Sequence, residues 1–471
     1  MKKVLMFVIT FSVLASSLFL SSCEDTEQSS ADEYSENDVS PEIRNQLNKS
    51  ISESDLLENA ELENKTIKWL SDWNINPDSS GKTKPIEVVV FEEKYGGKIE
   101  WIQCDYESRY EKLAKMINSG DGVDFFYAGN MDAFPKGAIR DMFVPVDDYI
   151  DFSSPIWAGV KEVNDSLIWN GSHYCTVVQT TGDKVACVYN RKTIQEAGLS
   201  DPAELYANGE WDWNSFQSML QKFSDADNQR YGLDGWWFEF GLISTTGVAP
   251  VSIKDSKIVS SIGSPAIERV QNFMYNLNQT GCIAIGVGDY GWDAHPEYIS
   301  EGKLLFYPVG LFEFYKEETQ WKEKFGEDVF FVPMPRDPDA DKYYTSVGME
   351  AYTLIKGGQN PEGVAKFLEC KRFTLLDETT KQIADAQFKN DYNWTDEMIE
   401  MQRSMQQLAD ENPFLDISKG VSGDCEEIID TNLRLSAKGV PWSETYDAIS
   451  PVIDVYIEKA NQNIDSDAAG E

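Results

Sequence analysis

The sequence predicts an α/β fold divided into two domains. Three apolar segments typical of strands, TIKWL, KIEWIQC and DFFYAG, lie between residues 65 and 130, and two segments typical of helices separate them. An alternation of strands and helices implies parallel strand pairing through right-handed crossovers. Once the termini are set aside, about 410 residues remain, which is more than one hydrophobic core normally organises.

The two intervening helices are predicted on different grounds. In PIEVVVFEEKYGG the valine run favours a strand by propensity, but Pro85 at the entry and Gly96 at the exit are typical of helix ends. In YESRYEKLAKMINSGDG, apolar residues recur at i, i+4, i+7 and i+11 from Tyr106 and form one helical face. Because ligands bind beyond the carboxyl ends of parallel strands, SDWNIN, CDYES and AGNMD are expected at one edge of the sheet.

The rest of the chain continues this mixed pattern. We expect two strands separated by a Gly-Asp turn in GSHYCTVVQTTGDKVACVYN, followed by helices in RKTIQEAGL and WNSFQSMLQKFSDAD. SPAIERVQNFMYNLNQTG should form a helix, KLLFYPVG and DVFFVPMP strands, and NPEGVAKFLECKRF a helix that Asn360 caps. The last hundred or so residues are polar and helical, and SPVIDVYIEKANQNI closes them.

The first residues are typical of an export signal. MKK precedes the apolar run VLMFVITFSVLASSLFL, which is too short for a comfortable membrane span and is followed by LSSC. This ending resembles a bacterial lipobox, so residues 1–22 are predicted to be cleaved and Cys23 to be lipidated; an ordinary signal peptide is the alternative. Residues 23–60 are rich in acid and serine, which predicts a disordered tether with occasional helix.

Composition excludes several classes of function. The formal net charge is −39 and no basic run exceeds a dipeptide, which argues against nucleic acid as a partner and against membrane contact beyond the anchor. The chain has only two histidines, which argues against catalysis by histidine. The six cysteines after Cys23 are widely spaced, so buried free thiols are expected, with a Cys175–Cys187 bridge as the alternative. RDPDADKYY begins like a calcium loop, but Lys342 and Gly348 replace required residues, so a solvated turn is expected and no metal or other cofactor.

Taken together, these segments resemble the type 1 extracellular solute-binding proteins, the substrate receptors of bacterial ABC importers. The carbohydrate-binding lipoproteins of that family, similar to the maltose-binding proteins, are the nearest in pattern. The resemblance rests on the order of FEEKYGGKIEWI…RYEKLAKMINSGDGVDFFY, GSHYCTVVQTTGDKVACVYNRKTIQEAGLSDP…W, EYISEGKLLFYPVG and VPMPRDPDADKYYTSVGMEAYTLIKGGQNPEGVAKFLE. One departure is Gln179, which stands where the family usually has a proline.

The resemblance implies a two-lobe periplasmic-binding-protein-like fold (type II-like) with three inter-lobe crossings. These are placed at Gln179–Asp183, Tyr307–Gly310 and Ser346–Ala351. The N-terminal α/β lobe would comprise 61–181 plus 310–347 and the C-terminal α/β lobe 182–309 plus 348–465, with 466–471 as a tail. It also implies a monomer, lipid-anchored on the outer face of the cytoplasmic membrane, that captures a mono- or oligosaccharide between the lobes and delivers it to ABC permease subunits.

Sugar binding requires flat aromatic faces and planar polar groups, which the chain offers at several loops. The predicted ligand-binding residues are Trp73, Asn130, Asp132, Trp237, Glu239, Trp292 and Glu350. In the stretch YGLDGWWFEFG an extended chain is expected, so that Trp237 and Glu239 face the ligand while Trp236, Phe238 and Phe240 pack the lobe. For every one of these residues, burial for packing alone is the competing interpretation.

Two other classes of function remain open. The acid excess would suit a peptide or cationic solute in place of a sugar. A secreted glycosidase would also use aromatic clefts and paired carboxylates, but the resemblance and the lack of a nucleophile motif argue against an enzyme.

Overall fold

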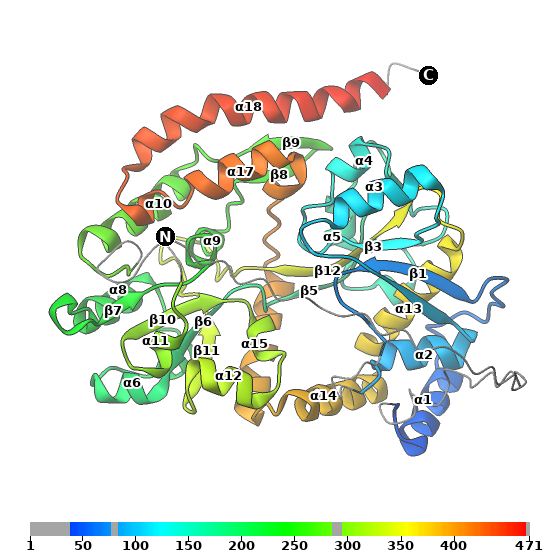
Figure 1. The fold of residues 1–471 in the computed structure, drawn as a ribbon, viewed down its shortest axis with the longest axis horizontal. Helices are drawn as coiled ribbons and strands as arrows, with labels where there is room; N and C mark the ends of the chain where they lie inside the picture. Colours follow the sequence, from blue (N-terminus) through cyan, green and yellow to red (C-terminus); the bar gives the residue numbers. More distant parts are fainter. Residues whose placement is uncertain (1–37, 77–82, 285–293, 468–471) are drawn as a thin grey trace, which may run out of the picture. The chain divides into compact units, whose positions relative to one another are not determined.

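The computed structural model describes residues 38–76, 83–284 and 294–467, and Figure 1 shows how their helices and strands are arranged. The first sheet has the order β2 (Lys98–Gln103), β1 (Thr66–Ser71), β3 (Phe125–Tyr127), β12 (Gly348–Ile355) and β4 (Phe143–Val144), with β5 (Thr176–Thr181) also paired to β12. β1 is parallel to both β2 and β3, which confirms the parallel pairing predicted for the first three strands.

Two helices connect these parallel strands where the sequence predicts them. α2 (Ile86–Tyr95) ends at Gly96, whose φ of 64° is left-handed, and a Cβ at Gly97 would lie 2.2 Å from the Phe91 ring. Gly96 and Gly97 therefore form the C-terminal cap of a helix, which confirms the helix predicted for the valine run. α3 (Arg109–Ser119) follows β2 and buries Leu113.

The acidic segment before β1 is not a tether as far as residue 60, contrary to the prediction. Residues 41–53 form α1 (Pro41–Glu53), which follows the N-cap residue Ser40. Its Leu47 and Ile51 are buried in the hydrophobic core that also contains residues of β1, β2 and β3. The prediction was wrong here because two apolar residues one helical turn apart suffice to bury one face once a partner surface exists.

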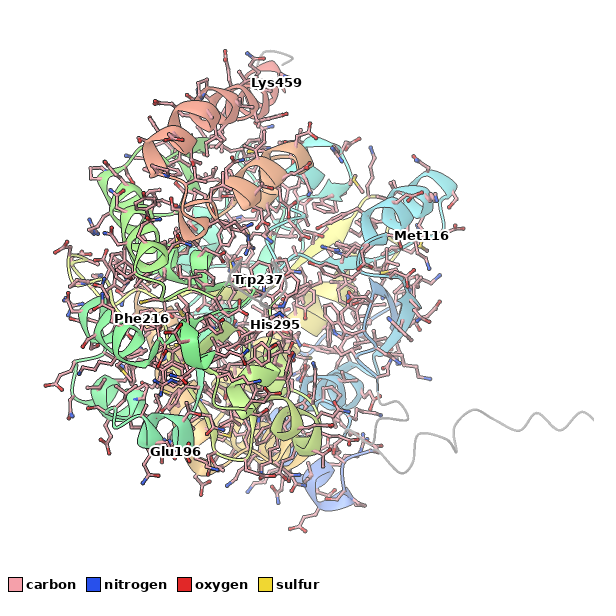
Figure 2. The ribbon with its side chains drawn as sticks, turned by 60° about the vertical axis from the view of Figure 1, so that its left-hand side comes forward. Met116, Glu196, Phe216, Trp237, His295 and Lys459 are labelled. Atoms are coloured by element: carbon pink, nitrogen blue, oxygen red, sulfur yellow. The ribbon has the colours of Figure 1, made fainter. Side chains whose placement is uncertain are left out.

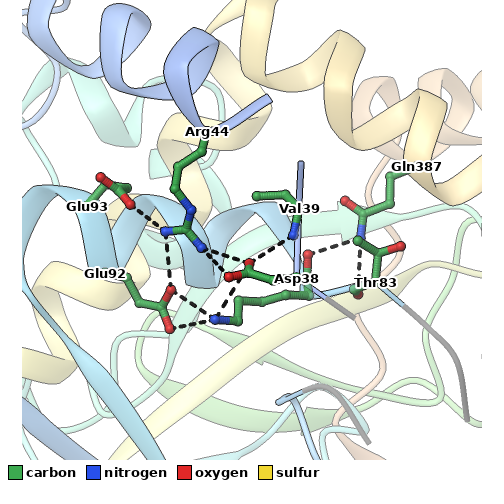
Figure 3. Close-up of polar contacts among 8 residues, drawn as sticks. Asp38, Val39, Arg44, Thr83, Glu92, Glu93 and Gln387 are labelled. Carbon is green, nitrogen blue, oxygen red and sulfur yellow. Dashed lines mark hydrogen bonds and ion pairs between the residues drawn. The ribbon is translucent and has the colours of Figure 1, made fainter. Parts of the chain in front are cut away.

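Ion pairs fix α1 in place (Figure 3). Arg44 on α1 bonds Glu93 on α2 and also Asp38 at 2.7 Å. Lys84 then links Asp38, at 3.8 Å, to Glu92 on α2, at 3.0 Å. The described part of the expected tether is therefore an integral piece of the first lobe.

The second sheet has the order β11 (Val329–Pro333), β6 (Ala186–Asn190), β10 (Leu304–Val309) and β7 (Tyr231–Leu233). β7 is parallel to β10, whereas β6 is antiparallel to both β10 and β11. The accompanying helices are α6 (Arg191–Glu196), α7 (Pro202–Ala207), α8 (Trp213–Phe223), α9 (Phe238–Ser244), α10 (Pro265–Gln279), α11 (Glu297–Ser300) and α12 (Glu318–Phe325). The hairpin of β8 (Val251–Lys254) and β9 (Lys257–Ser260) completes this half of the fold.

The C-terminal region supplies α13 (Pro361–Leu376), α14 (Glu378–Tyr392), α15 (Asp396–Glu411), α16 (Ser418–Val421), α17 (Gly423–Asn432) and α18 (Trp442–Asp467). Short helices fill the connections, among them α4 (Lys136–Ile139), α5 (Lys161–Ser166), η1 (Pro155–Trp157), η2 (Ala226–Asn228), η3 (Leu311–Phe314) and η4 (Ser436–Lys438). The Asn360 side chain accepts a hydrogen bond from Gly363 N, so the predicted cap of α13 is confirmed. Two sheets, each flanked by helices, give the two-lobe α/β fold that the resemblance implies.

The lobe boundaries within the chain differ from the prediction. The change of sheet between β5 and β6 lies at residues 182–185, beside the predicted crossing at Gln179–Asp183. The crossing expected at Tyr307–Gly310 does not occur, because β10 and β11 belong to the same sheet. Residues 310–333, assigned to the N-terminal lobe, therefore stay with the second sheet.

The lobe assignment of the later part of the chain also differs from the prediction. The crossing near Ser346–Ala351 exists, but there the chain returns to the first sheet through β12. α13, expected in the C-terminal lobe, packs against α2. α14 contacts α1, and α15 contacts both β5 and β11, so the third connection runs through α14 and α15. The prediction was wrong because strand propensity identifies a strand but not its partner.

Three further expectations can be compared with the described residues. The six cysteines after Cys23 are free and buried, and the alternative Cys175–Cys187 bridge is wrong because Cys175 adjoins the first sheet while Cys187 lies in β6 of the second. No helix in the described ranges is long and apolar enough to cross a bilayer. The turn at 337–341 is only partly solvated, since Asp337 is fully buried and paired with Arg269.

Candidate ligand-binding site

Exposed aromatic rings stand at the carboxyl ends of the strands of the first sheet. Trp73 follows β1 and is 41% exposed, and Tyr106 follows β2 and is 47% exposed. Trp73 stands edge-on to Trp69 at 4.9 Å and to Tyr127 at 5.0 Å, so two neighbouring rings fix its orientation. The exposed Asn130 follows β3, and because the three strands are parallel all these side chains belong to one edge of the sheet.

The second sheet repeats this arrangement. Trp236 follows β7 and is 54% exposed, and Phe312 follows β10 and is 52% exposed. β7 and β10 are parallel, so both rings also share an edge. Of the five exposed aromatic rings among the described residues, only Tyr149 lies elsewhere.

Residues from the two edges contact each other through α16 and α17. A Cβ at Gly420 in α16 would lie 1.7 Å from the carbonyl oxygen of Phe134, which is in the loop after β3. Lys136 Nζ lies 3.4 Å from the carbonyl oxygen of Lys419, and burial lowers the pKa of the Lys136 ammonium even though Glu426 on α17 counteracts it. The loop after β3 therefore contacts α16, whose Lys419 ammonium also lies 5.0 Å from the ring centre of Trp237, beyond β7 of the second sheet.

The stretch around Trp236 is not extended, so the predicted alternation of its side chains is wrong, although Phe238 is buried as predicted. Gly235 has a φ of 141°, and a Cβ there would lie 2.7 Å from the Pro308 carbonyl oxygen, so the chain turns sharply after β7. α9 then begins at Phe238, with Trp237 as its N-cap residue. In a helical turn, neighbouring side chains no longer alternate between two opposite sides as they do in a strand.

Trp236, which is 54% exposed, is therefore the presented ring in place of Trp237. Trp237, labelled in Figure 2, is half-buried, with the Lys419 ammonium 5.0 Å and the Arg434 guanidinium 5.7 Å from its ring centre. Phe238 is fully buried and Glu239 is 1% exposed. Trp237 and Glu239 therefore lie behind the surface that Trp236 forms.

Glu239 is paired inside the protein and is not available to a ligand directly. Its Oε2 accepts a hydrogen bond from Arg434 Nη1 at 3.1 Å. Burial raises the pKa of Glu239 to about 7, although Arg434 and Lys438 act in the opposite direction.

Asp132 is also paired with a protein group, and its contact with a ligand stays a prediction. Its side chain bonds Arg109 on α3, and Asp132 is only 6% exposed. The Arg109 guanidinium lies 3.6 Å from the centre of the Tyr106 ring. Asp132 thus supports Tyr106 through Arg109, and Asn130 Nδ2 lies 3.5 Å from the Tyr106 hydroxyl.

Glu350 lies within a network that joins the strands leading between the sheets. It is the register partner of Gln179 on β5, and Gln179 Nε2 donates to Glu350 Oε2 at 2.9 Å. Tyr352 and Lys371 bond its other oxygen at 2.9 Å and 2.7 Å. The contact of Glu350 with a ligand stays a prediction.

The predicted residues thus separate into two groups. Trp73 and Asn130 lie exposed at the first edge, whereas Asp132, Trp237 and Glu239 stand behind it or behind the second edge. Glu350 is partly exposed and lies on β12, beside Gln179 of β5. Trp292 lies outside the described residues. Sequence reasoning missed Tyr106, Trp236 and Phe312, although each follows a strand by three residues, and that spacing is the signal that could have found them.

Comparisons with known proteins agree with this architecture. The family model described as bacterial extracellular solute-binding protein matches residues 73–370. The chain belongs to this family. No curated protein sequence matches the chain.

Solved structures extend the likeness in fold. A cyclo/maltodextrin-binding protein complexed with maltotetraose has a TM-score of 0.58 at 14% identity, over 85% of this chain and 98% of that one. The extracellular solute-binding protein from Staphylococcus aureus in complex with maltose has a TM-score of 0.57 at 11% identity, over 86% and 98%. A transporter-associated binding protein from B. animalis subsp. lactis Bl-04 in complex with β-1,6-galactobiose has a TM-score of 0.55 at 15% identity, over 84% and 98%.

Proposed function

We propose that this extracellular solute-binding protein captures an oligosaccharide between its two sheet edges and delivers it to an ABC permease. The observation that carries the proposal is the set of exposed rings, Trp73, Tyr106, Trp236 and Phe312, each of which follows the carboxyl end of a strand. Sugar faces carry C–H groups that pack on aromatic rings, and their hydroxyls require planar polar groups such as that of Asn130. The sugars bound by structurally similar proteins support the same class of ligand.

The energy required is modest. A dissociation constant near micromolar corresponds to about −8 kcal/mol, and each neutral hydrogen bond contributes about 1 kcal/mol. Four rings and several hydrogen bonds are sufficient without any catalytic group.

The proposal includes attachment to the membrane through Cys23. Cleavage before Cys23 and lipidation of its amino terminus would hold the protein near its permease at the outer face of the cytoplasmic membrane. Mass spectrometry of the native protein should show a diacylated or triacylated Cys23 as the first residue. An unmodified Cys23 would remove the anchor from the proposal but leave sugar capture intact.

The test of sugar capture is a thermal-shift screen of mono- and oligosaccharides, including maltotetraose and β-1,6-galactobiose. A ligand at a hundred times its dissociation constant should stabilise the fold by about 2.7 kcal/mol. Trp236→Ala and Trp73→Ala should abolish the shift, whereas Tyr149→Ala, which removes the exposed ring that lies elsewhere, should leave it unchanged. If peptides or polyamines raise the melting temperature and no sugar does, the carbohydrate assignment fails.

A further inference from the structure

The turn that presents Trp236 lies between two regular elements and needs its own support. β7 ends at Leu233 and α9 begins at Phe238, so residues 234–237 connect a strand to a helix of seven residues. Arg434, which lies just beyond α17, contacts this turn from outside. Its Nη1 donates to the carbonyl oxygen of Trp236 at 2.7 Å and to Glu239 Oε2 at 3.1 Å.

The remaining contacts of Arg434 hold the guanidinium itself. Nη2 bonds Asp430 Oδ1 at 3.3 Å, and the carbon of the guanidinium lies 4.9 Å from the Phe240 ring and 5.7 Å from the Trp237 ring. One planar group therefore joins the backbone of the turn, the first turn of α9 and the end of α17. A lysine ammonium could not make this set of contacts, because it lacks the fixed fork of donors.

We propose that Arg434, held by Glu239, is a positioning residue that fixes the Trp236–Trp237 turn and so orients Trp236 for the sugar. This inference rests on the proposed function. Arg434 need not touch the ligand, because it acts through the Trp236 carbonyl oxygen.

Stability alone does not account for this buried pair. Glu239 is 1% exposed, and taking a carboxylate out of water costs more than one ion pair commonly returns. The pair instead ties together segments nearly two hundred residues apart in the chain. Within the turn, Asp234 N pairs with Phe306 on β10 at 3.2 Å and the Trp237 carbonyl oxygen accepts from Gly241 N at 2.8 Å, whereas the Trp236 carbonyl oxygen accepts from Arg434.

The same pair should make the turn respond to pH near neutrality. The charged groups that act on Glu239 are Arg434 and Lys438, which favour the carboxylate, and Asp430, which opposes it. α10 and β10 also pack against α9 and add no charged group to that set among the described residues. Because the pKa of Glu239 is raised to about 7, protonation should weaken its bond to Arg434 as the pH falls below that value.

The test uses fluorine NMR of the full chain carrying 5-fluorotryptophan at its 13 tryptophans, with no ligand present. Trp236→Phe and Trp237→Phe identify the two signals. In the parent protein both signals should move between about pH 5 and about pH 9 with a midpoint near 7, and Glu239→Gln should abolish that movement. Arg434→Met and Arg434→Lys should both displace or broaden the Trp236 signal.

Arg191→Met is the matched control. Arg191 also pairs with a carboxylate, Glu397 at 2.7 Å, and also lies over a ring, Phe330 at 3.9 Å, but on α6. The Arg191→Met variant should leave the Trp236 signal unchanged. If the signal in Arg434→Met coincides with that of the parent protein, or does not titrate in the parent protein, the proposal is wrong.

A binding arm separates this inference from the proposed function. With maltotetraose and β-1,6-galactobiose as probes, Arg434→Met should weaken binding about tenfold or more, and Arg191→Met should not. If a sugar binds and Arg434→Met leaves its affinity unchanged, positioning fails while sugar capture stands. If neither probe binds although the Trp236 signal moves in Arg434→Met, positioning stands and sugar capture loses its support.

Discussion

At the scale of single residues, Glu239 illustrates how burial changes what a side chain can do. Its pKa is raised to about 7 from a reference value of 4.5, so the folded protein holds a proton that the unfolded chain releases. A carboxyl shifted upward stabilises the fold fully below the unfolded pKa, and that contribution is lost as the pH rises through the folded pKa. The loss amounts to about 3 kcal/mol between those limits.

Glu239→Gln should remove this pH dependence. We expect the variant to gain stability relative to the parent protein at about pH 8 and to match it more closely at about pH 5. Denaturant unfolding at the two pH values measures the difference. Glu427→Gln, at a carboxyl on α17, serves as control. An equal effect of Glu239→Gln at both pH values would contradict the raised pKa.

Gly420 sets a different constraint, because its neighbour is a backbone atom. A Cβ there would lie 1.7 Å from the Phe134 carbonyl oxygen, so Gly420→Ala must displace α16 from the loop after β3. The expected cost is about 1–3 kcal/mol, as for other overpacked sites. Gly423→Ala is the control, since a Cβ there meets nothing within 4 Å. Calorimetry compares the two, and equal melting temperatures would contradict the close contact.

At the scale of elements, α1 changes where the folded chain begins. Leu47 is fully buried, and Ser50 donates to Asp377, the cap of α14, at 2.6 Å. A chain that starts at residue 61 should therefore melt lower than one that starts at residue 38. Leu47→Ala alone should cost about 2–5 kcal/mol, and Asn48→Ala, at an exposed position on the same helix, much less. Equal stability of the two chain lengths would show that α1 contributes nothing.

The helices and strands also show which features of the fold could be predicted from the sequence. Strands and helices could be predicted because their signals are local: alternation in β1 and β2, glycines after α2, and the Asn360 cap before α13. The sheet that each strand joins could not, because nothing local in β11 (VFFVP) or in β12 (GMEAYTLI) indicates that the two strands pair in different sheets. Pairing depends on contacts distant in sequence, which local propensity does not contain.

The residues of the candidate site also fall into those that local sequence could predict and those that depend on contacts distant in the chain. Trp73 could be placed because it follows a predicted strand, but Trp236 and Trp237 are adjacent and equally aromatic. Which of them is presented depends on Gly235, whose close approach to Pro308 turns the chain before α9. The paired state of Asp132 and Glu239 depends on arginines elsewhere in the chain and was invisible for that reason.

At the scale of the whole molecule, the six free cysteines offer a test of how completely the two cores are formed. All six are buried, and burial raises the pKa of Cys175 and of Cys425 to about 12. A thiol reagent at neutral pH should therefore react with none of these six in the native protein. In denaturant it should react with all of them. Fast reaction under native conditions would contradict the packing of the core that holds the reactive cysteine.

The pairing of β12 with β3, β4 and β5 has a consequence for the order of folding. The first sheet lacks its central strand until residue 355 has been synthesised, and the second sheet is formed from the segment that comes before it. Closing such long chain loops is slow compared with forming local contacts. Until β12 has been made, β3, β4 and β5 lack the strand with which all three pair, so the first sheet cannot be completed on a shorter nascent chain.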